Sequence, residues 1–311
     1  EEHRKPGSLI TSNTSGIPIH MMLEGRSDDF KKHFCGTHFF NPPRYMRLLE
    51  VIPTTETSPE VVAFFLHYGD IYLGKQTVLC KDTPAFIANR VGVYAMAKIY
   101  QLTTELGLRI EEVDKLTGPT IGRPKTGTFR LGDLVGHDTA ANVINGLKQN
   151  CPDDEQASTF EIPKYLKFLL DNKFLGNKTG QGFYKRTKEK DENGRRVILA
   201  LNLETLEYEP SQKPDLPSLK MAKQIDDQDK RIEALFDAED KGGELVRKSL
   251  LGLFAYVSNR IPEISDNLYS IDDAMKAGYA WNVGPFEYWD IIGIGKGIEL
   301  AEEQGEKSAP W

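Results

Sequence analysis

The stretch GTHFFNPPRYMRLLEVI, residues 36–52, contains two β-prone runs separated by a turn with two adjacent prolines. The runs predict a β-hairpin with its midpoint near Arg44. In such a hairpin His38 and Glu50 face each other, with their Cβ atoms about 4.5–5.5 Å apart. A carboxylate that accepts a hydrogen bond from one imidazole nitrogen leaves the other nitrogen basic. The spacing alone leaves two interpretations open: a catalytic base with its orienting carboxylate, or a structural His–Glu pair.

Strands and helices alternate around this hairpin. A strand is expected within residues 7–15, a short helix within 17–25, a helix within 58–74 that starts with Ser58 and Pro59, and a strand within 76–82. About 80 residues are too few for a complete doubly wound dinucleotide-binding domain. The pattern therefore predicts only a partial, Rossmann-type sheet edge.

The rest of the chain is expected to be mainly helical. A long helix is predicted over residues 83–107, with Thr83 as its N-cap and Pro84 at its first position. A hairpin that turns at Asn193 and Gly194 and a proline-rich linker interrupt the helices. From about residue 219 to the end the chain is again expected to be helical.

Two helical segments share a sequence pattern. GTFRLGDLVG (127–136) and GPFEYWDIIG (284–293) both read G-x-F-x-x-x-D-[LI]-[VI]-G, 157 residues apart, which favours two copies of one helical domain. Asp133 and Asp290 are interpreted as structural carboxylates that face the positive end of a helix dipole, because the second copy has no equivalent of His38.

These patterns together predict an α+β fold that is mainly α: a partial dinucleotide-binding sheet edge followed by two repeated helical domains. The predicted segments are residues 1–81 for the sheet, 82–186 for the first helical copy, 187–217 for the hairpin and linker, and 218–311 for the second copy.

Composition narrows the function classes. The chain has 311 residues, a net charge of −7 and a pI near 5.5, which gives no reason to expect nucleic acid or an anionic membrane as a partner. No apolar run approaches the roughly 18–20 residues of a membrane span. Cys35, Cys80 and Cys151 are widely spaced without a CxxC pair, so neither a metal site nor a disulfide framework is expected. A reducing compartment, the cytoplasm, fits this cysteine usage.

Four motifs occur in an order that is typical of one family. SNTSGIP, GTHFFNPPRYMRLLEVI, CKDTPAFIANRVG and NKTGQGFYK resemble, in order and spacing, the L-3-hydroxyacyl-CoA dehydrogenase family. The resemblance covers residues 7–185 and, through the repeat, about residues 243–302. It implies oxidation of the 3-hydroxyl of a fatty acyl-CoA to a ketone with NAD, as in β-oxidation. It also implies that both helical domains are of the type that forms the C-terminal domain in this family.

The resemblance also implies roles for individual residues. His38 matches the family's general base, and Glu50 matches the carboxylate that orients this base. Ser15 matches a serine that contacts both substrate and nicotinamide, although a turn serine is the alternative. Asn89 matches an asparagine near the reacting carbon, where an amide donor polarises the developing carbonyl oxygen. An ordinary polar residue on a helix is the alternative for Asn89.

Two further residues match contacts to NAD: Asn41 in HFFNP and Lys178 in NKTGQGFY. For Lys178, a solvated surface lysine is the alternative. The family also has a strand, a G-x-G-x-x-G turn and a helix at its start, and nothing in this sequence matches that pattern. GIGKG (293–297) follows a helical segment and lacks the preceding strand. We therefore expect the chain to be a fragment without the main NAD-binding half, and to bind NAD and turn over weakly or not at all.

Larger members of the family carry a hydratase-type domain, so an attached or partner domain of this type is expected, and the helical copies are expected to pack within the chain. Two rival functions stay open at this point. One is a non-catalytic helical assembly module in which His38 and Glu50 are inert. The other is a related dehydrogenase for another hydroxy acid.

Overall fold

The computed structural model describes residues 1–311, which divide into two compact units. The first unit combines residues 1–92, 256–287 and 309–311, and the second combines residues 93–255 and 288–308. This division differs from the four predicted segments, because packing joins residues that lie far apart along the chain. The chain is mostly helical, as predicted, and none of its helices is long and apolar enough to cross a membrane.

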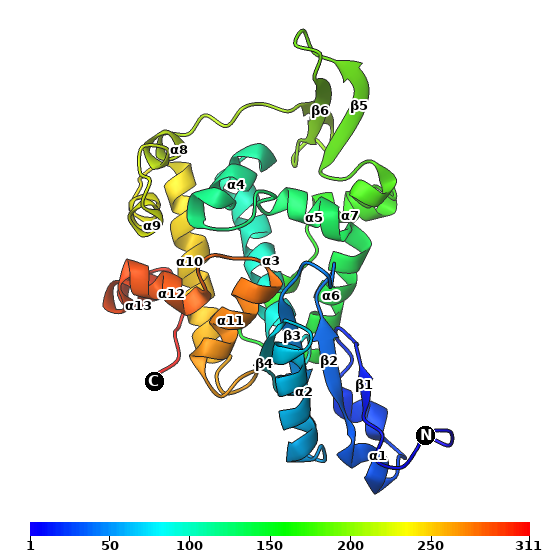
Figure 1. Cartoon of the computed structure of the whole chain (residues 1–311). Coiled ribbons are helices and arrows are strands. Elements are labelled where there is room, and N and C mark those ends of the chain that lie inside the picture. Colours follow the sequence, from blue (N-terminus) through cyan, green and yellow to red (C-terminus); the bar gives the residue numbers. More distant parts are fainter. The chain divides into compact units, whose positions relative to one another are not determined.

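A four-stranded sheet forms the centre of the first unit (Figure 1). Its strands lie in the order β1-β2-β3-β4, with bounds Ile10–Ser12, Phe34–Phe39, Leu48–Ile52 and Gln76–Leu79. The β1–β2 and β3–β4 pairs are parallel, and the central β2–β3 pair is antiparallel. The predicted hairpin is confirmed, because His38 pairs with Glu50 in the β2–β3 register.

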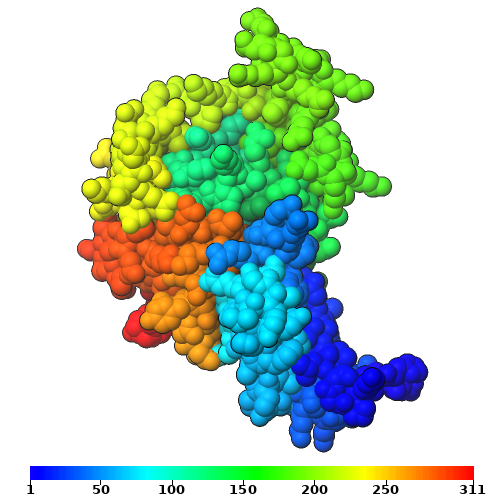
Figure 2. All heavy atoms as spheres, viewed as in Figure 1, coloured from blue at the N-terminus to red at the C-terminus, as the bar shows by residue number.

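Helices α2 (Pro59–Ile71) and α11 (Leu268–Gly278) pack on this sheet. The first begins with Pro59 after Ser58, as the sequence predicts. The second contacts β3 and β4, and a Cβ added at Gly278 would lie 2.6 Å from Cδ2 of Leu48, so the end of this helix lies directly on the strand. Figure 2 shows the orange surface of this segment beside the blue and cyan surface of the N-terminal residues. The shorter elements of the unit are η1 (Ile19–Leu23) and α1 (Asp28–Lys32).

The predicted start of the long helix at Thr83 and Pro84 is wrong. Helix α3 runs over Ala88–Leu106, because Ala85 and Phe86 adopt left-handed backbone angles (φ 63° and 54°) that turn the chain before the helix begins. Thr83 does not cap the helix, and its buried hydroxyl has no hydrogen-bond partner. The sequence does not reveal this turn, because a left-handed conformation is uncommon for alanine and phenylalanine.

The second unit is helical apart from one three-stranded sheet. Its sheet has the order β5-β6-β7, turns at Gly194 with a positive φ of 73°, and confirms the predicted hairpin. Buried aromatic rings of Tyr100, Phe129, Tyr165 and Phe183 fill the space between its helices. The remaining elements are α4 (Ile110–Leu116), η2 (Pro119–Ile121), α5 (Phe129–Val135), α6 (His137–Asn150), η3 (Ala157–Phe160), α7 (Lys164–Asp171), η4 (Asn177–Thr179), β5 (Tyr184–Lys190), β6 (Arg196–Leu201), β7 (Tyr208–Pro210), α8 (Pro217–Ala222), α9 (Gln228–Phe236), α10 (Lys241–Asn259), α12 (Pro285–Ile292) and α13 (Ile294–Glu303).

Residues from the two helical segments contact each other inside this second unit. The Tyr94 hydroxyl donates to the Gly252 carbonyl at 3.1 Å, and the Tyr288 hydroxyl donates to the Ile121 carbonyl at 2.5 Å. The predicted packing of the helical segments within one chain is therefore present.

The two copies of the glycine-containing pattern share their backbone geometry. Gly136 and Gly293, the last residues of the pattern, have φ values of 99° and 91°, so each ends one helix and leads into the next in a conformation that favours glycine. Gly127 and Gly284, the first residues, leave no room for a side chain: an added Cβ would lie 2.4 Å from the backbone oxygen of Asp114 or from Cγ of Asp272.

The same two aspartates hold the helix that follows. An oxygen of Asp114 accepts from the backbone amide of Phe129 at 2.6 Å, and an oxygen of Asp272 accepts from the amide of Phe286 at 2.8 Å. Burial raises the pKa of each carboxyl to about 7. A buried carboxylate at a helix start therefore occurs at matching places in both copies of the pattern.

Candidate active site

The His38 and Glu50 side chains form a buried pair on the β2–β3 hairpin. Nδ1 of His38 lies 2.6 Å from Oε2 of Glu50, and the two residues are only 3% and 0% exposed. Register explains the contact, since directly opposed residues of an antiparallel pair project to the same face. No hydrogen bond joins Nε2 of His38 to any protein group. This second nitrogen is therefore available to an external hydroxyl.

Glu50 also lies at the N-terminus of α3. Its Oε1 atom accepts hydrogen bonds from the backbone amides of Ile87 and Ala88, at 3.1 and 2.9 Å. These are among the amides that a helix leaves unpaired at its start, where the helix dipole also favours negative charge. The tight turn before Ala88 brings both amides to one carboxylate oxygen. A buried carboxylate thus receives three donors and is fixed in place on both sides.

Aromatic rings surround the imidazole. The centroids of the Phe40 and Phe86 rings lie 4.7 and 5.6 Å from that of His38. These apolar walls limit the directions from which water or substrate can reach the ring. Neither phenylalanine was predicted to belong to the site, although Phe40 lies in the same HFF run as His38.

Asn89 lies one residue inside α3, next to the amide of Ala88 that binds Glu50. It is half-buried, and its Oδ1 atom accepts a hydrogen bond from the Tyr279 hydroxyl at 3.3 Å. The first turn of α3 therefore connects the predicted substrate contact at Asn89 to the predicted catalytic carboxylate. Tyr279 is a residue that sequence analysis missed. No local pattern could reveal it, because 190 residues separate it from Asn89.

Ser15 and Asn41 are both exposed, and neither side chain makes a hydrogen bond within the chain. Ser15 follows β1, which runs parallel to β2 with Ser12 beside Gly36. Both strands therefore run toward the same end of the sheet. Ser15 lies beyond β1 at that end, toward which β2 continues to His38. Asn41 follows β2 by two residues. Both side chains are thus free to bind a ligand.

Lys178 belongs to the second compact unit, within η4. Its ammonium pairs with the exposed carboxylate of Asp138 at 2.5 Å and lowers the pKa of that carboxyl. The structure therefore gives Lys178 a surface ion pair.

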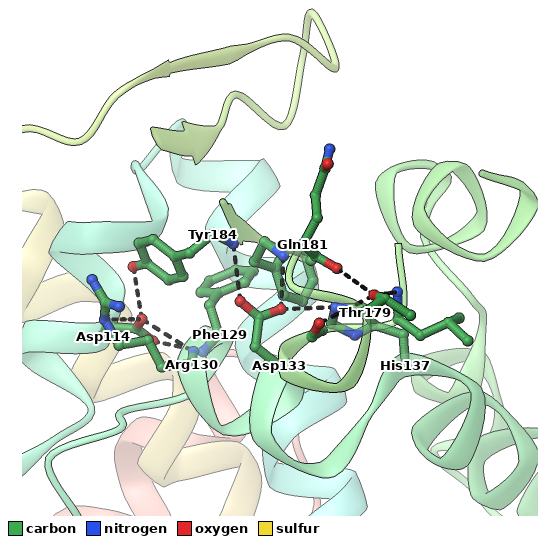
Figure 3. Close-up of polar contacts among 12 residues, drawn as sticks. Asp114, Phe129, Arg130, Asp133, His137, Thr179, Gln181 and Tyr184 are labelled. Carbon is green, nitrogen blue, oxygen red and sulfur yellow. Dashed lines mark hydrogen bonds and ion pairs between the residues drawn. The ribbon is translucent and has the colours of Figure 1, made fainter. Parts of the chain in front are cut away.

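A second cluster of buried polar side chains lies in the second unit (Figure 3). Tyr184 connects its two carboxylates: its hydroxyl donates to Asp114 at 2.7 Å, and its backbone amide donates to Asp133 at 2.9 Å. Asp133 also accepts from the Phe183 amide at 2.7 Å and lies 2.9 Å from Nε2 of His137. Asp133 thus ties α5 to the start of β5, instead of facing the start of a helix as predicted. Asp290, its counterpart in the second copy, is exposed.

The chain contains no group of three or more histidine, cysteine or acidic side chains arranged to hold a metal ion. Cys35, Cys80 and Cys151 are all buried. The candidate chemistry therefore rests on the His38–Glu50 pair.

Two family models match consecutive parts of the chain. The NAD binding domain of 3-hydroxyacyl-CoA dehydrogenase matches residues 1–83, and the C-terminal domain of 3-hydroxyacyl-CoA dehydrogenase matches residues 86–186, together more than half of the chain. The expectation that the NAD-binding half is missing is not supported, since the domain match begins at residue 1.

Relatives extend the similarity beyond residue 186. A probable 3-hydroxyacyl-CoA dehydrogenase of Bacillus subtilis is 43% identical over 100% of this chain and 38% of its own length. A putative fatty acid oxidation complex trifunctional enzyme of Rickettsia felis is 33% identical over 92% of the chain and 38% of its own length. The chain thus spans less than two fifths of these two relatives.

The fold is shared with a solved structure, 3-hydroxybutyryl-CoA dehydrogenase of Escherichia coli K12. The TM-score is 0.68 at 20% identity, over 97% of this chain and 73% of that chain. At this identity the likeness concerns the fold alone. Both halves of the chain are nevertheless covered by it. The two domain matches and the relatives of this name establish that the chain belongs to the 3-hydroxyacyl-CoA dehydrogenase family.

Proposed function

We propose that this chain carries the catalytic base of an NAD-dependent 3-hydroxyacyl-CoA dehydrogenase of fatty-acid oxidation. The observation that carries the proposal is the His38–Glu50 pair, with Nδ1 bound at 2.6 Å and Nε2 left without a protein partner. The substrate class, a fatty 3-hydroxyacyl-CoA, follows from the names of the relatives, which include a fatty acid oxidation complex trifunctional enzyme.

His38 is the general base in this proposal. Nε2 accepts the proton of the substrate 3-hydroxyl while the hydrogen on C3 leaves as hydride, so that C3 and its oxygen become a ketone. Glu50 holds Nδ1 protonated and stabilises the imidazolium that forms. Its own negative charge is compensated by the amides of Ile87 and Ala88. The Nδ2 group of Asn89 donates to the oxygen that gains carbonyl character.

NAD, when bound, supplies the hydride acceptor. Ser15 and Asn41 fit a role in holding it, because both side chains are exposed, free of protein partners and close in sequence to strands that end near His38. Ser15 also remains the candidate for a substrate contact. Lys178 stays a candidate NAD contact through its family motif, although its observed partner is Asp138.

The prediction that these 311 residues alone bind NAD weakly and turn over weakly or not at all stays a prediction.

We also propose that the helical part is a duplicated family domain and that a hydratase-type domain is attached to or associated with it. The duplication is supported by the matched glycines and by the helix-start carboxylates Asp114 and Asp272. The hydratase-type partner is supported only by the trifunctional name of the Rickettsia relative. A cytoplasmic location belongs to the same proposal and rests on the wide spacing of the three cysteines, which form no CxxC pair.

The test is His38→Gln in the protein that contains this chain, assayed with NAD and 3-hydroxyacyl-CoA esters of several chain lengths. Loss of a general base lowers kcat by about 10²–10⁴-fold. His67→Gln, an exposed histidine on α2, is the matched control and is expected to keep wild-type activity. Unchanged activity in His38→Gln would instead support a non-catalytic assembly module. Turnover of other 3-hydroxy acids but not of CoA esters would support the related-dehydrogenase alternative.

A further inference from the structure

Tyr279 is the C-cap residue of α11, and it reaches the first turn of α3 within the first compact unit. Its hydroxyl donates to Oδ1 of Asn89 at 3.3 Å. The helix that carries it is held on the sheet by its contacts with β3 and β4. The tyrosine therefore comes from a fixed element.

The direction of this hydrogen bond decides how the Asn89 amide is turned. A side-chain amide has one oxygen that accepts and one NH₂ group that donates, and the two are nearly identical in shape. Without a partner, either end could face the ligand. A hydroxyl that donates to Oδ1 holds the oxygen toward Tyr279, so the NH₂ group faces away from it. Only this orientation offers a donor to a ketone or alkoxide oxygen.

The Tyr279 ring has little freedom to move. A Cβ added at Gly92, one helical turn after Asn89, would lie 2.2 Å from Cζ of Tyr279, so the hydroxyl end of the ring lies directly against the α3 backbone. Its centroid lies 6.1 Å from that of Phe40, which in turn lies 4.7 Å from that of His38. Burial, and then the charge of Glu50, raises the pKa of the Tyr279 hydroxyl, which keeps it protonated and able to donate at neutral pH.

We propose that Tyr279 is a positioning residue that fixes the side-chain amide of Asn89 with its NH₂ group turned toward the substrate oxygen. This inference rests on the proposed function. It assigns a part in the site to the C-terminal helical segment, which the two domain matches do not reach. Tyr279 acts only through Asn89 and does not itself touch the reacting atoms.

The decisive variant is Tyr279→Phe in the intact protein, because it keeps the ring against Gly92 and removes only the hydroxyl. Losing one neutral hydrogen bond that orients a transition-state donor is expected to lower kcat by about five- to tenfold. KM for the acyl-CoA should change much less, since the contact strengthens as the oxygen gains charge. Tyr269→Phe on the same helix, whose side chain is 71% exposed, is the matched control and should match wild type.

A double-mutant cycle tests whether Tyr279 acts through Asn89. In an Asn89→Ala background, Tyr279→Phe should cause no further loss of kcat. If the two substitutions lowered kcat by independent factors that multiply in the double variant, the inference would be overturned. Wild-type kcat in Tyr279→Phe would overturn it as well. Either result leaves the proposed function intact. If Tyr279→Phe has the melting temperature of wild type, its lower kcat reflects a loss of positioning and not a general loss of stability.

A readout independent of activity covers the case in which the proposed function itself fails. The side-chain amide resonances of Asn89, identified by their loss in Asn89→Asp, should shift in Tyr279→Phe and stay in place in Tyr269→Phe. Unshifted resonances in Tyr279→Phe would show that the hydroxyl does not hold the amide.

Discussion

His38 and Glu50 are joined by a hydrogen bond of 2.6 Å between Nδ1 and Oε2, across two antiparallel strands. The other Glu50 oxygen accepts from the amides of Ile87 and Ala88 at the start of α3. One carboxylate therefore sets both the tautomer of the imidazole and the position of the helix that carries Asn89.

Glu50→Gln is expected to damage both activity and stability. The amide keeps an oxygen for the α3 amides, but its NH₂ group then meets Nδ1 of His38 and favours the wrong tautomer, so kcat should fall by about 10²–10⁴-fold. Loss of the charge at a helix N-terminus and of charge-assisted bonds should lower the free energy of unfolding by about 1–3 kcal/mol. Steady-state kinetics and denaturant unfolding measure the two effects. Glu56→Gln, at an exposed position, should change neither kcat nor the free energy of unfolding by much. If Glu50→Gln and Glu56→Gln gave the same kcat and the same free energy of unfolding, the role of Glu50 would be contradicted.

Gly92→Ala should be destabilising although alanine is the better helix former. The new methyl would lie 2.2 Å from Cζ of Tyr279, and this steric clash is expected to cost about 1–3 kcal/mol in unfolding free energy. The displaced ring should also lower kcat as Tyr279→Phe does. Gly146→Ala in α6, where an added Cβ meets nothing within 4 Å, is the matched control and should stabilise the protein by up to about 1 kcal/mol. If Gly92→Ala were also stabilising and fully active, the close contact with Tyr279 would be refuted.

Asp114 should make stability depend on pH. Burial raises the pKa of its carboxyl from 3.8 to about 7, so the folded chain keeps a proton where the unfolded chain has lost it. The stabilising contribution is fully present below about pH 4 and is lost as the pH rises through about 7, amounting to at most about 4 kcal/mol at 1.36 kcal/mol per pKa unit.

Asp114→Asn removes this titration and keeps an oxygen for the Phe129 amide. Its unfolding free energy, measured by denaturant titration at several pH values, should therefore decline less between pH 4 and 7 than that of wild type. Asp171→Asn, an exposed aspartate, should keep the wild-type slope. An undiminished slope in Asp114→Asn would mean that this carboxyl is not the titrating group.

The three cysteines should resist thiol reagents in the folded protein. Cys35, Cys80 and Cys151 are buried. Burial raises the pKa of the Cys35 thiol to about 12 and that of the Cys80 thiol well above its usual value. Ellman's reagent at pH 8 is therefore expected to react slowly with the native protein. After unfolding, it should react readily with all three thiols. Thr55→Cys, at an exposed position, should react at once. Rapid native reaction of wild type would indicate that one of these sites opens easily.

Local patterns predicted much of this protein correctly. The β2–β3 hairpin follows from two β-prone runs around a proline turn, and its register places His38 opposite Glu50. The helix after Ser58 and the hairpin at Gly194 follow from capping and turn residues in the same way. The start of α3 did not follow, because a carboxylate from β3 caps it in place of Thr83.

The sequence by itself determined the family motifs, the pairing of His38 with Glu50 and the mainly helical character, since each depends on residues within about twenty positions of one another. Only the tertiary structure decided that α11 packs on β3 and β4 and that Tyr279 binds Asn89 across 190 residues. It also decided that the carboxylates of Asp114 and Asp133 are buried around Tyr184. Such contacts arise when distant segments bury their apolar faces together. This driving force has no direction, so the residue pattern of one segment does not show which distant segment it packs against.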